Sequence, residues 1–248
     1  MNHLSGQQGK FYTVPSHALL SRLDATYYDP LKNLVLSLLQ DGAESGRFRI
    51  ETIGNIAKRI FFPGRFKRVY VSSDNGIPFL SGADIVQFDL TNIKYLSRRS
   101  SNLPELLVKK DWVLVTRSGT VGIAIKVPEY MDGFAVSEHV IRIVPDENKV
   151  DAGYLYAVLS SELGSSLLKP GVHGSVVDEI SPEYIAQQRI PVPDRIAQKK
   201  IGDLVRKADR HLTEALRLHL LARNEIFNLL GLSRERIRLG LKPHLLTE

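Results

Sequence analysis

The chain has 248 residues, 43% of them hydrophobic, and its 33 Lys and Arg against 27 Asp and Glu give a formal net charge of +6. This ordinary globular composition allows one large domain or two small ones, and the absence of cysteine excludes a disulfide framework and a thiolate metal site. The sequence has no recognisable signal peptide, and its longest nearly uncharged apolar run covers only residues 34–39, so we expect a cytoplasmic protein without a membrane span.

The basic residues are distributed unevenly along the chain. Residues 47–71 hold seven Lys or Arg and one Glu, residues 94–117 hold six and two acidic residues, and residues 195–248 hold twelve and six. Residues 118–194 hold five and eleven. This segregation indicates a basic face whose natural partner is a polyanion, although chance clustering of solvated surface charges is the alternative.

Residues 1–46 are expected to form an N-terminal segment with one helix. Its first 16 residues are polar and show no periodicity. Leucines then fall at helical spacing between Leu19 and Leu39, with Pro30 where a first-turn proline is tolerated. Asp41-Gly42 is expected to close this helix.

Residues 47–194 are expected to form an α+β domain with a small twisted β-sheet and flanking helices. Short β-prone runs separated by Gly, Pro, Asn and Asp predict strands at residues 69–71, 77–80, 112–115, 121–127 and 140–144. Helical spacing predicts a helix over residues 151–168, and Ser181-Pro-Glu183 is typical of the start of a short helix.

The most informative segment is the polar turn from Arg117 to Thr120, between two of the predicted strands. Gly119 and Gly122 allow the backbone to approach a polar partner closely. Arg117 offers a guanidinium, while Ser118 and Thr120 offer hydroxyls. DNA phosphates and base edges fit this combination of groups.

A long amphipathic helix of the coiled-coil type is predicted within residues 195–232, followed by a basic tail at residues 233–248. From about Gln198 to Leu230 it would extend roughly 50 Å, more than a domain of this size needs for its own core. We therefore expect its apolar stripe to pair with a helix of a second copy or of a partner protein, with folding back on its own domain as the alternative. The residues expected at this pairing surface are Ile201, Val205, Ala208, Leu212, Leu216, Leu220, Ile226, Phe227 and Leu230.

Seven short sequence blocks, spread over most of the chain, carry a resemblance to a known family through their order and spacing. They are Arg22-Leu-Asp-Ala-Thr-Tyr-Tyr-Asp-Pro30, Gly76-Ile-Pro-Phe-Leu80, Lys109–Gly122, Ser137-Glu-His-Val-Ile-Arg142, Gly153-Tyr-Leu-Tyr156, His173-Gly-Ser175 and Ile190-Pro-Val-Pro193 running into Gln198. With these blocks the chain resembles the target-recognition half of the specificity subunits of type I restriction-modification systems.

The resemblance implies a particular assembly. Complete members of that family carry two recognition domains held apart by two long antiparallel helices, and each domain reads one half of a split DNA target. One domain and one helix imply a half-sized member that homodimerises and reads a split palindrome. The implied partners are double-stranded DNA, a DNA methyltransferase subunit and, as an optional addition, a restriction endonuclease subunit.

DNA contacts are expected on basic and polar loop residues, because phosphate contacts position a domain and a few side chains read base edges. Contacts to the DNA backbone are assigned to Lys58, Arg59, Arg65, Lys67 and Arg68, around a turn at Phe61-Phe-Pro-Gly64 expected to lift them off the sheet. Base reading is assigned to Ser81, Gly82, Arg117, Ser118, Thr120, His173, Gly174 and Ser175, and either role to Lys94, Arg98 and Arg99. For each lone basic residue the alternative is a solvated surface charge, and His139 is expected to be structural, inside a strand.

No catalytic motif is recognisable in the sequence. It lacks the Asn/Asp-Pro-Pro-Tyr/Phe motif of adenine methyltransferases, the phosphate loop of helicases and a His-x-Glu zinc arrangement. We therefore expect a non-catalytic subunit without cofactor or metal. Two other functions remain open: an orphan DNA-binding regulator or detached specificity piece of another restriction enzyme, and a protein-interaction adaptor that works through its helix.

Overall fold

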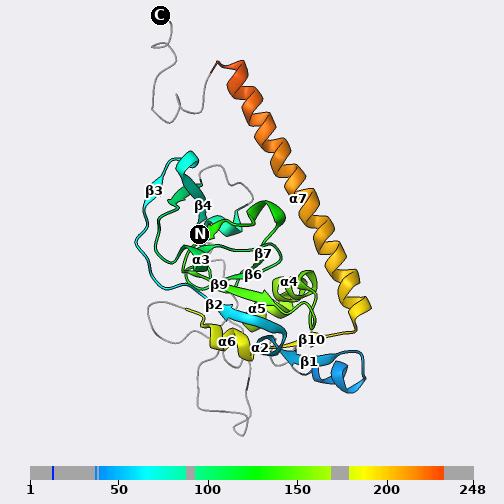
Figure 1. The fold of residues 1–248 in the computed structure, drawn as a ribbon. Coiled ribbons are helices and arrows are strands. Elements are labelled where there is room, and N and C mark those ends of the chain that lie inside the picture. The colour runs from blue at the N-terminus through cyan, green and yellow to red at the C-terminus, as the bar shows by residue number, and fades with distance from the viewer. Residues whose placement is uncertain (1–12, 14–36, 38, 88–92, 169–178, 232–248) are drawn as a thin grey trace, which may run out of the picture.

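The computed structural model describes residues 13, 37, 39–87, 93–168 and 179–231 (Figure 1). These residues form an α+β fold with a long C-terminal helix, which confirms the predicted fold class. The predicted contact residues His173, Gly174 and Ser175 lie outside the described residues, as do most of the N-terminal segment and the basic tail.

A four-stranded antiparallel sheet lies at the centre of the fold, in the strand order β2-β9-β6-β7. Its strands are β2 (Ala57–Phe61), β6 (Val113–Thr116), β7 (Ala124–Lys126) and β9 (Val140–Pro145). Every residue of β6 is buried, because Val113 and Val115 face one hydrophobic cluster and Leu114 faces another. Burial on both faces explains why this strand appears in the sequence as an unbroken apolar run.

A second four-stranded sheet has the order β3-β5-β4-β8, in which only β4 and β8 run parallel. Its strands are β3 (Tyr70–Val71), β4 (Gly76–Leu80), β5 (Lys94–Ser97) and β8 (Ala135–Val136). The short helices around it are η2 (Ser73–Asn75), η3 (Asp84–Val86), α3 (Leu103–Leu106) and η4 (Glu129–Met131).

A two-stranded antiparallel pair joins the two ends of the domain, β1 (Arg49–Thr52) with β10 (Arg189–Val192). Four helices pack near this pair and the central sheet: α2 (Ile53–Ile56), α4 (Ala152–Ser160), α5 (Glu162–Leu168) and α6 (Pro182–Gln187). Their apolar side chains and one face of the central sheet form the largest hydrophobic cluster. The small sheet expected from the sequence is therefore three separate sheets.

Helix α7 (Arg195–Leu229) follows β10 directly, and the Asp194 carboxylate caps its first turn by accepting a hydrogen bond from the Ala197 amide. Its first turns cross α4 where Gly153 meets Gly202, so closely that a Cβ built on Gly153 would lie 2.8 Å from the Gly202 Cα. Farther along, α7 extends past the domain (Figure 1). No helix among the described residues is long and apolar enough to cross a membrane.

Three local predictions are wrong for identifiable reasons. The N-terminal helix continues through Asp41-Gly42 to residue 44 and ends before Gly46, whose φ is 72°. The strand predicted over residues 121–127 begins only at Ala124, because Gly122 has a φ of 84°. The helix predicted over residues 151–168 is interrupted at Ser161, where the backbone is extended and separates α4 from α5.

Candidate nucleic-acid interface

The turn formed by residues 137–139, between β8 and β9, brings several predicted contact segments together. The Ser137 amide donates a hydrogen bond of 2.9 Å to the Leu80 carbonyl, next to Ser81 and Gly82. The Arg117 amide donates one of 2.9 Å to the carbonyl of His139. The segment after β4 and the polar loop after β6 are therefore fixed against the same turn.

The same turn holds the basic connection between β2 and β3. Both side-chain oxygens of Glu138 accept hydrogen bonds of 2.9 Å from Nη2 of Arg68. Burial opposes ionisation of Glu138, but hydrogen bonding from the backbone and Arg68 and the charge of Arg68 outweigh it and hold the pKa of this carboxyl below 4.5. At neutral pH the pair is ionised, so Arg68 is directed by a carboxylate and is not a freely solvated charge.

Arg142 supports the 137–139 turn from inside the protein. Its side chain is fully buried, and its guanidinium donates hydrogen bonds to four backbone carbonyls, those of Leu106, Val136, Ser137 and Val140. Burial lowers the pKa of Arg142 to about 9, which keeps the group charged at neutral pH. Charged donors make stronger hydrogen bonds than neutral ones, so one side chain holds both ends of the turn.

The loop of residues 117–122 has the close-packed backbone that its glycines predict. Gly119 and Gly122 have φ values of 77° and 84°. The Thr116 hydroxyl donates to the Thr120 carbonyl and accepts a hydrogen bond of 2.9 Å from the Ile123 amide, which closes the loop across its base. Gly119 and Thr120 are exposed at its tip, while Arg117 and Ser118 are partly buried.

Arg117 itself is held by two side chains that the sequence did not single out. Its guanidinium carbon lies 4.2 Å from the centre of the Phe62 ring, and its Nη2 lies 2.5 Å from a carboxylate oxygen of Glu179. The Arg117 side chain is 21% exposed. The residue is therefore oriented at the surface of the loop and does not extend freely into solvent.

His139 lies in the turn before β9 and not inside a strand, which corrects its predicted place. Its Nδ1 is 2.9 Å from the Ser118 hydroxyl oxygen, a hydrogen bond across the two loops. Its side chain is 42% exposed beside Glu138. A half-exposed imidazole in contact with Ser118 belongs with the candidate interface, in addition to the structural role expected for it.

The turn expected at residues 61–64 is absent from this part of the structure. Lys58 and Arg59 lie on β2 itself, where the pairing register with β9 shifts by one residue, and residues 62–69 form an extended connection. A bulge of this kind redirects side chains locally. Arg59 is directed to Glu105 at 3.5 Å and stacks on the ring of Phe61 at 3.8 Å.

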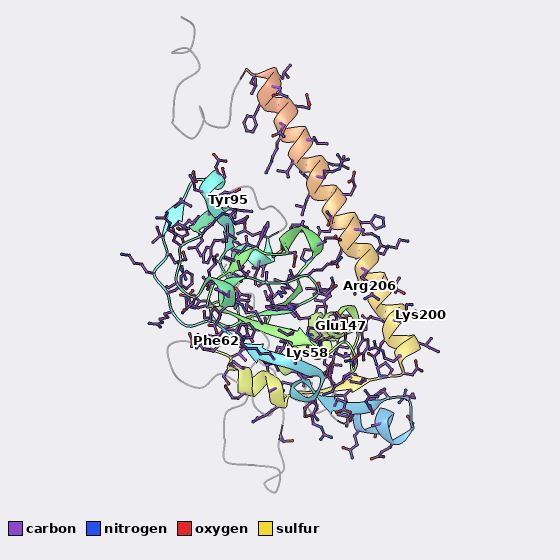
Figure 2. All side chains as sticks on the ribbon, viewed as in Figure 1. Lys58, Phe62, Tyr95, Glu147, Lys200 and Arg206 are labelled. Carbon is purple, nitrogen blue, oxygen red and sulfur yellow. The ribbon has the colours of Figure 1, made fainter. Side chains whose placement is uncertain are left out.

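The remaining basic candidates lie at the surface and are spread over several elements. Arg65 and Lys67 are exposed on the extended connection, and Arg98 and Arg99 are exposed in the turn after β5. The ammonium of Lys94 lies 5.1 Å from the centre of the Tyr70 ring. Figure 2 shows Lys58 and Phe62 on the side of the domain away from the projecting end of α7.

Four side chains that orient the candidates were not predicted from the sequence: Phe62, Glu138, Arg142 and Glu179. One of them carried a usable signal, because Arg142 is a charged residue inside the apolar strand Val140 to Val144 and such a residue needs several polar partners. The other three act across the fold. Glu138 and Glu179 lie 70 and 62 residues from the arginines that they hold.

The residues predicted for helix pairing are mostly uncovered. Leu212, Leu220, Ile226 and Leu230 have exposed fractions between 37% and 60%. Ile201 and Ala208 are exposed as well, whereas Val205, Leu216 and Phe227 are partly buried. Within the part of the chain that the structure describes, the first half of α7 packs against its own domain and the second half projects beyond it, so the alternative of folding back applies there to the first half (Figure 1).

Three solved structures from type I restriction-modification systems match part of this chain. A chain from a study of complex assembly and conformational transition of the type I R-M system matches with 15% identity and a TM-score of 0.49, over 80% of this chain and 50% of that one. The HsdS subunit from Thermoanaerobacter tengcongensis matches with 16% identity and a TM-score of 0.48, over 75% and 46%. The S subunit of the type I restriction-modification system from M. genitalium matches with 15% identity and a TM-score of 0.44, over 79% and 48%.

This chain spans about half the length of those structures. A search of curated proteins gave no match. The family model described as the type I restriction modification DNA specificity domain matches residues 52–222, which include both large sheets and most of α7. The chain therefore belongs to the family of type I restriction modification DNA specificity domains.

Proposed function

We propose that this chain is a sequence-specific DNA-recognition subunit of a type I-like restriction-modification system and that it is not itself catalytic. The observation that carries the proposal is the convergence of predicted contact segments on the 137–139 turn, in a chain that belongs to a DNA specificity family. Hydroxyl, guanidinium and imidazole groups in one area are suited to reading base edges.

The exposed stripe of α7 supports the second part of the proposal, a homodimer. Residues 47–194 would read DNA and residues 195–232 would pair two copies and set the distance between their readers. A two-fold dimer presents identical readers, so the target would be a split palindrome. In the cytoplasm, this chain would direct a methyltransferase subunit, with or without an endonuclease subunit, to that target.

Selection of duplexes from a randomised DNA pool by the purified chain at moderate salt tests both parts. A split palindrome is expected among the retained sequences, and an unsplit half-site would contradict the dimer. Purification with and without the methyltransferase subunit separates a chain that needs its partner from one that reads DNA alone. Retention of DNA without any sequence preference, in both forms, would contradict base reading.

Individual base readers can be separated from backbone contacts by substitution. Arg117→Ala should weaken binding to the selected duplex by about 1–3 kcal/mol while leaving binding to unrelated DNA nearly unchanged. Lys67→Ala, which removes an exposed charge on the extended connection, is the matched control and should weaken binding to all sequences equally. Equal losses for both kinds of DNA in Arg117→Ala would contradict base reading by this residue.

A further inference from the structure

Glu179 is the residue whose place in the site the sequence does not explain, because an acidic side chain within a DNA-binding surface repels phosphates. We propose that Glu179 is a positioning residue that holds the Arg117 guanidinium ready to contact a guanine in the target. The inference rests on the proposed function and adds to it a specificity-determining residue and the base that it serves.

The backbone keeps Glu179 beside Arg117. The amide of Ile180 donates a hydrogen bond of 3.2 Å to the Arg117 carbonyl, while the Arg117 amide donates to the carbonyl of His139. Arg117 is therefore bonded on both sides of its own backbone. The ion pair with Glu179 is a built contact between two fixed segments and not a chance meeting of two long side chains.

The side chain of Arg117 is restrained on its face and at one nitrogen. Phe62 covers one face of the guanidinium, and the Glu179 carboxylate accepts from Nη2. A free arginine loses much of its side-chain entropy when it is fixed on a ligand. An arginine already held in place has lost most of that entropy before DNA arrives, which favours the specific complex.

The restraint leaves hydrogen-bond donors for a ligand. A guanidinium has five N–H donors, and among the described residues only Nη2 has a hydrogen-bond partner. Nε is buried without one. The remaining N–H donors at Nη1 and Nη2 match the paired acceptors O6 and N7 of guanine. The Glu179 carboxylate accepts a single hydrogen bond from Nη2, so it leaves these donors available for a base edge.

Glu179→Gln tests the proposal, because Gln keeps the shape of the side chain and removes its charge. Glu147→Gln is the matched control: Glu147 is exposed in the turn between β9 and α4, so this variant reports the effect of removing one negative charge elsewhere. Affinities for the selected duplex and for a scrambled duplex are measured by fluorescence anisotropy at one salt concentration, for both variants, for Arg117→Ala and for the double variant of Arg117 and Glu179.

The expected result is a loss of about tenfold in affinity of Glu179→Gln for the selected duplex, as for removal of a charged hydrogen bond. Its affinity for scrambled DNA should change only as much as in Glu147→Gln. In the Arg117→Ala background, Glu179→Gln should cause no further specific loss. Guanines of the selected duplex are then replaced one at a time. The base that is read is the guanine whose replacement weakens binding by wild type but is tolerated equally by Arg117→Ala and Glu179→Gln.

Two results would overturn the positioning role while leaving DNA recognition intact. One is a parallel change of both affinities in Glu179→Gln and Glu147→Gln. The other is tighter specific binding in Glu179→Gln, because Glu179 would then mask Arg117. A wild-type chain that prefers no duplex, with or without the methyltransferase subunit, is a different result and overturns the proposed function together with this inference.

Discussion

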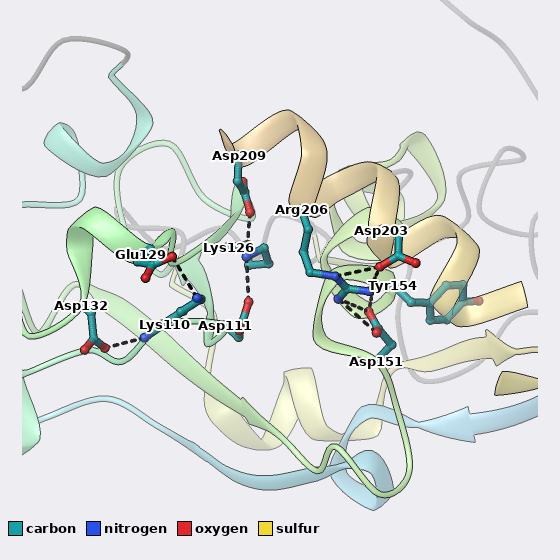
Figure 3. Close-up of polar contacts among 10 residues, drawn as sticks. All are labelled: Lys110, Asp111, Lys126, Glu129, Asp132, Asp151, Tyr154, Asp203, Arg206 and Asp209. Atoms are coloured by element: carbon teal, nitrogen blue, oxygen red, sulfur yellow. Dashed lines mark hydrogen bonds and ion pairs between the residues drawn. The ribbon is translucent and has the colours of Figure 1, made fainter. Parts of the chain in front are cut away.

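Lys126 of β7 and Asp209 of α7 form an ion pair of 2.7 Å that joins the α+β domain to the long helix (Figure 3). The same ammonium lies 2.8 Å from the Asp111 carboxylate, and the Lys126 side chain is only 3% exposed. Burial opposes its charge, but the hydrogen bonds and charges of the two carboxylates outweigh this and raise the pKa of Lys126 above 10.5. The lysine is therefore charged while buried between the domain and α7.

Replacement of this lysine should weaken the junction of domain and helix. Lys126→Met leaves the two partly buried carboxylates facing each other without a cation, and we expect a loss of about 3 kcal/mol in the free energy of unfolding. Urea unfolding followed by circular dichroism measures it. Lys110→Met is the control, because Lys110 and Glu129 form an exposed pair expected to contribute less than about 1 kcal/mol. Equal losses in the two variants would contradict the assigned role.

The stability of the protein should also depend on the close crossing of α4 and α7, where there is no room for an added methyl group. Gly153→Ala would place a methyl group 2.8 Å from the Gly202 Cα, and backbone atoms cannot move away without shifting the helix. We expect a destabilisation of about 1–3 kcal/mol in thermal unfolding. Gly64→Ala introduces the same methyl where nothing lies within 4 Å, and its stability should stay within about 0.5 kcal/mol of wild type. An unchanged Gly153→Ala would show that the helices can move apart freely.

The Arg68 and Glu138 pair should make stability depend on pH in the acidic range. The folded-state pKa of Glu138 lies below 4.5, so the unfolded chain takes up this proton at a higher pH than the folded one. The contribution is therefore fully present above about pH 4.5 and is lost as the pH falls through the lower folded-state value. Wild type should exceed Glu138→Gln in stability at pH 7, and the difference should shrink toward pH 3.

Arg68→Met provides the control for that titration. It removes the partner that holds Glu138 ionised, so it should reduce the same pH-dependent difference, and combining it with Glu138→Gln should add little. Unfolding curves at a series of pH values between 7 and 3 measure all four chains. A difference that stays constant over this range would show that the pair does not stabilise the folded state through its charge.

Much of the fold could be predicted because several elements carry strong local signals. Strand β6 is an unbroken apolar run, and α7 has a long amphipathic period beginning at the cap Asp194. Among the strands that were not predicted are β1, β2, β5 and β10. β2 lies at the edge of the central sheet with Lys58 and Arg59 exposed, so it lacks the alternating pattern of a buried strand. β10 does alternate in burial, but it is short and contains Pro191, which argues against a strand.

The candidate site was predictable only in part. Loop composition identified Arg117 and Ser118, because glycines and polar residues after an apolar strand are a local signal. What holds Arg117 is not local: Phe62 and Glu179 come from segments on either side of it in sequence, and only tertiary packing brings them together. The orientation of a predicted contact residue therefore had to come from the structure.

The apolar stripe of α7 leads to a prediction about assembly. Val205, Leu212 and Ile226 are separated by whole heptads, the spacing that keeps side chains on one coiled-coil seam. Ile226 is 56% exposed in the single chain, so it has room for a partner. Ile226→Lys would place an ammonium in that seam, where burial of an unpaired charge is strongly unfavourable. We expect wild type to be a dimer and Ile226→Lys a monomer in sedimentation equilibrium at the same concentration.

Leu218→Lys is the matched control, since Leu218 is 52% exposed on the same helix but lies outside the heptad series of Ile226. It should remain dimeric. The duplexes selected by each chain give a second measurement: Leu218→Lys should still retain a split palindrome, whereas Ile226→Lys should retain one half-site, because its reading domain is unchanged but unpaired. A monomeric wild type, or dimers in both variants, would show that this seam does not join two copies. The exposed leucines of α7 would then be expected to pack against a different partner chain.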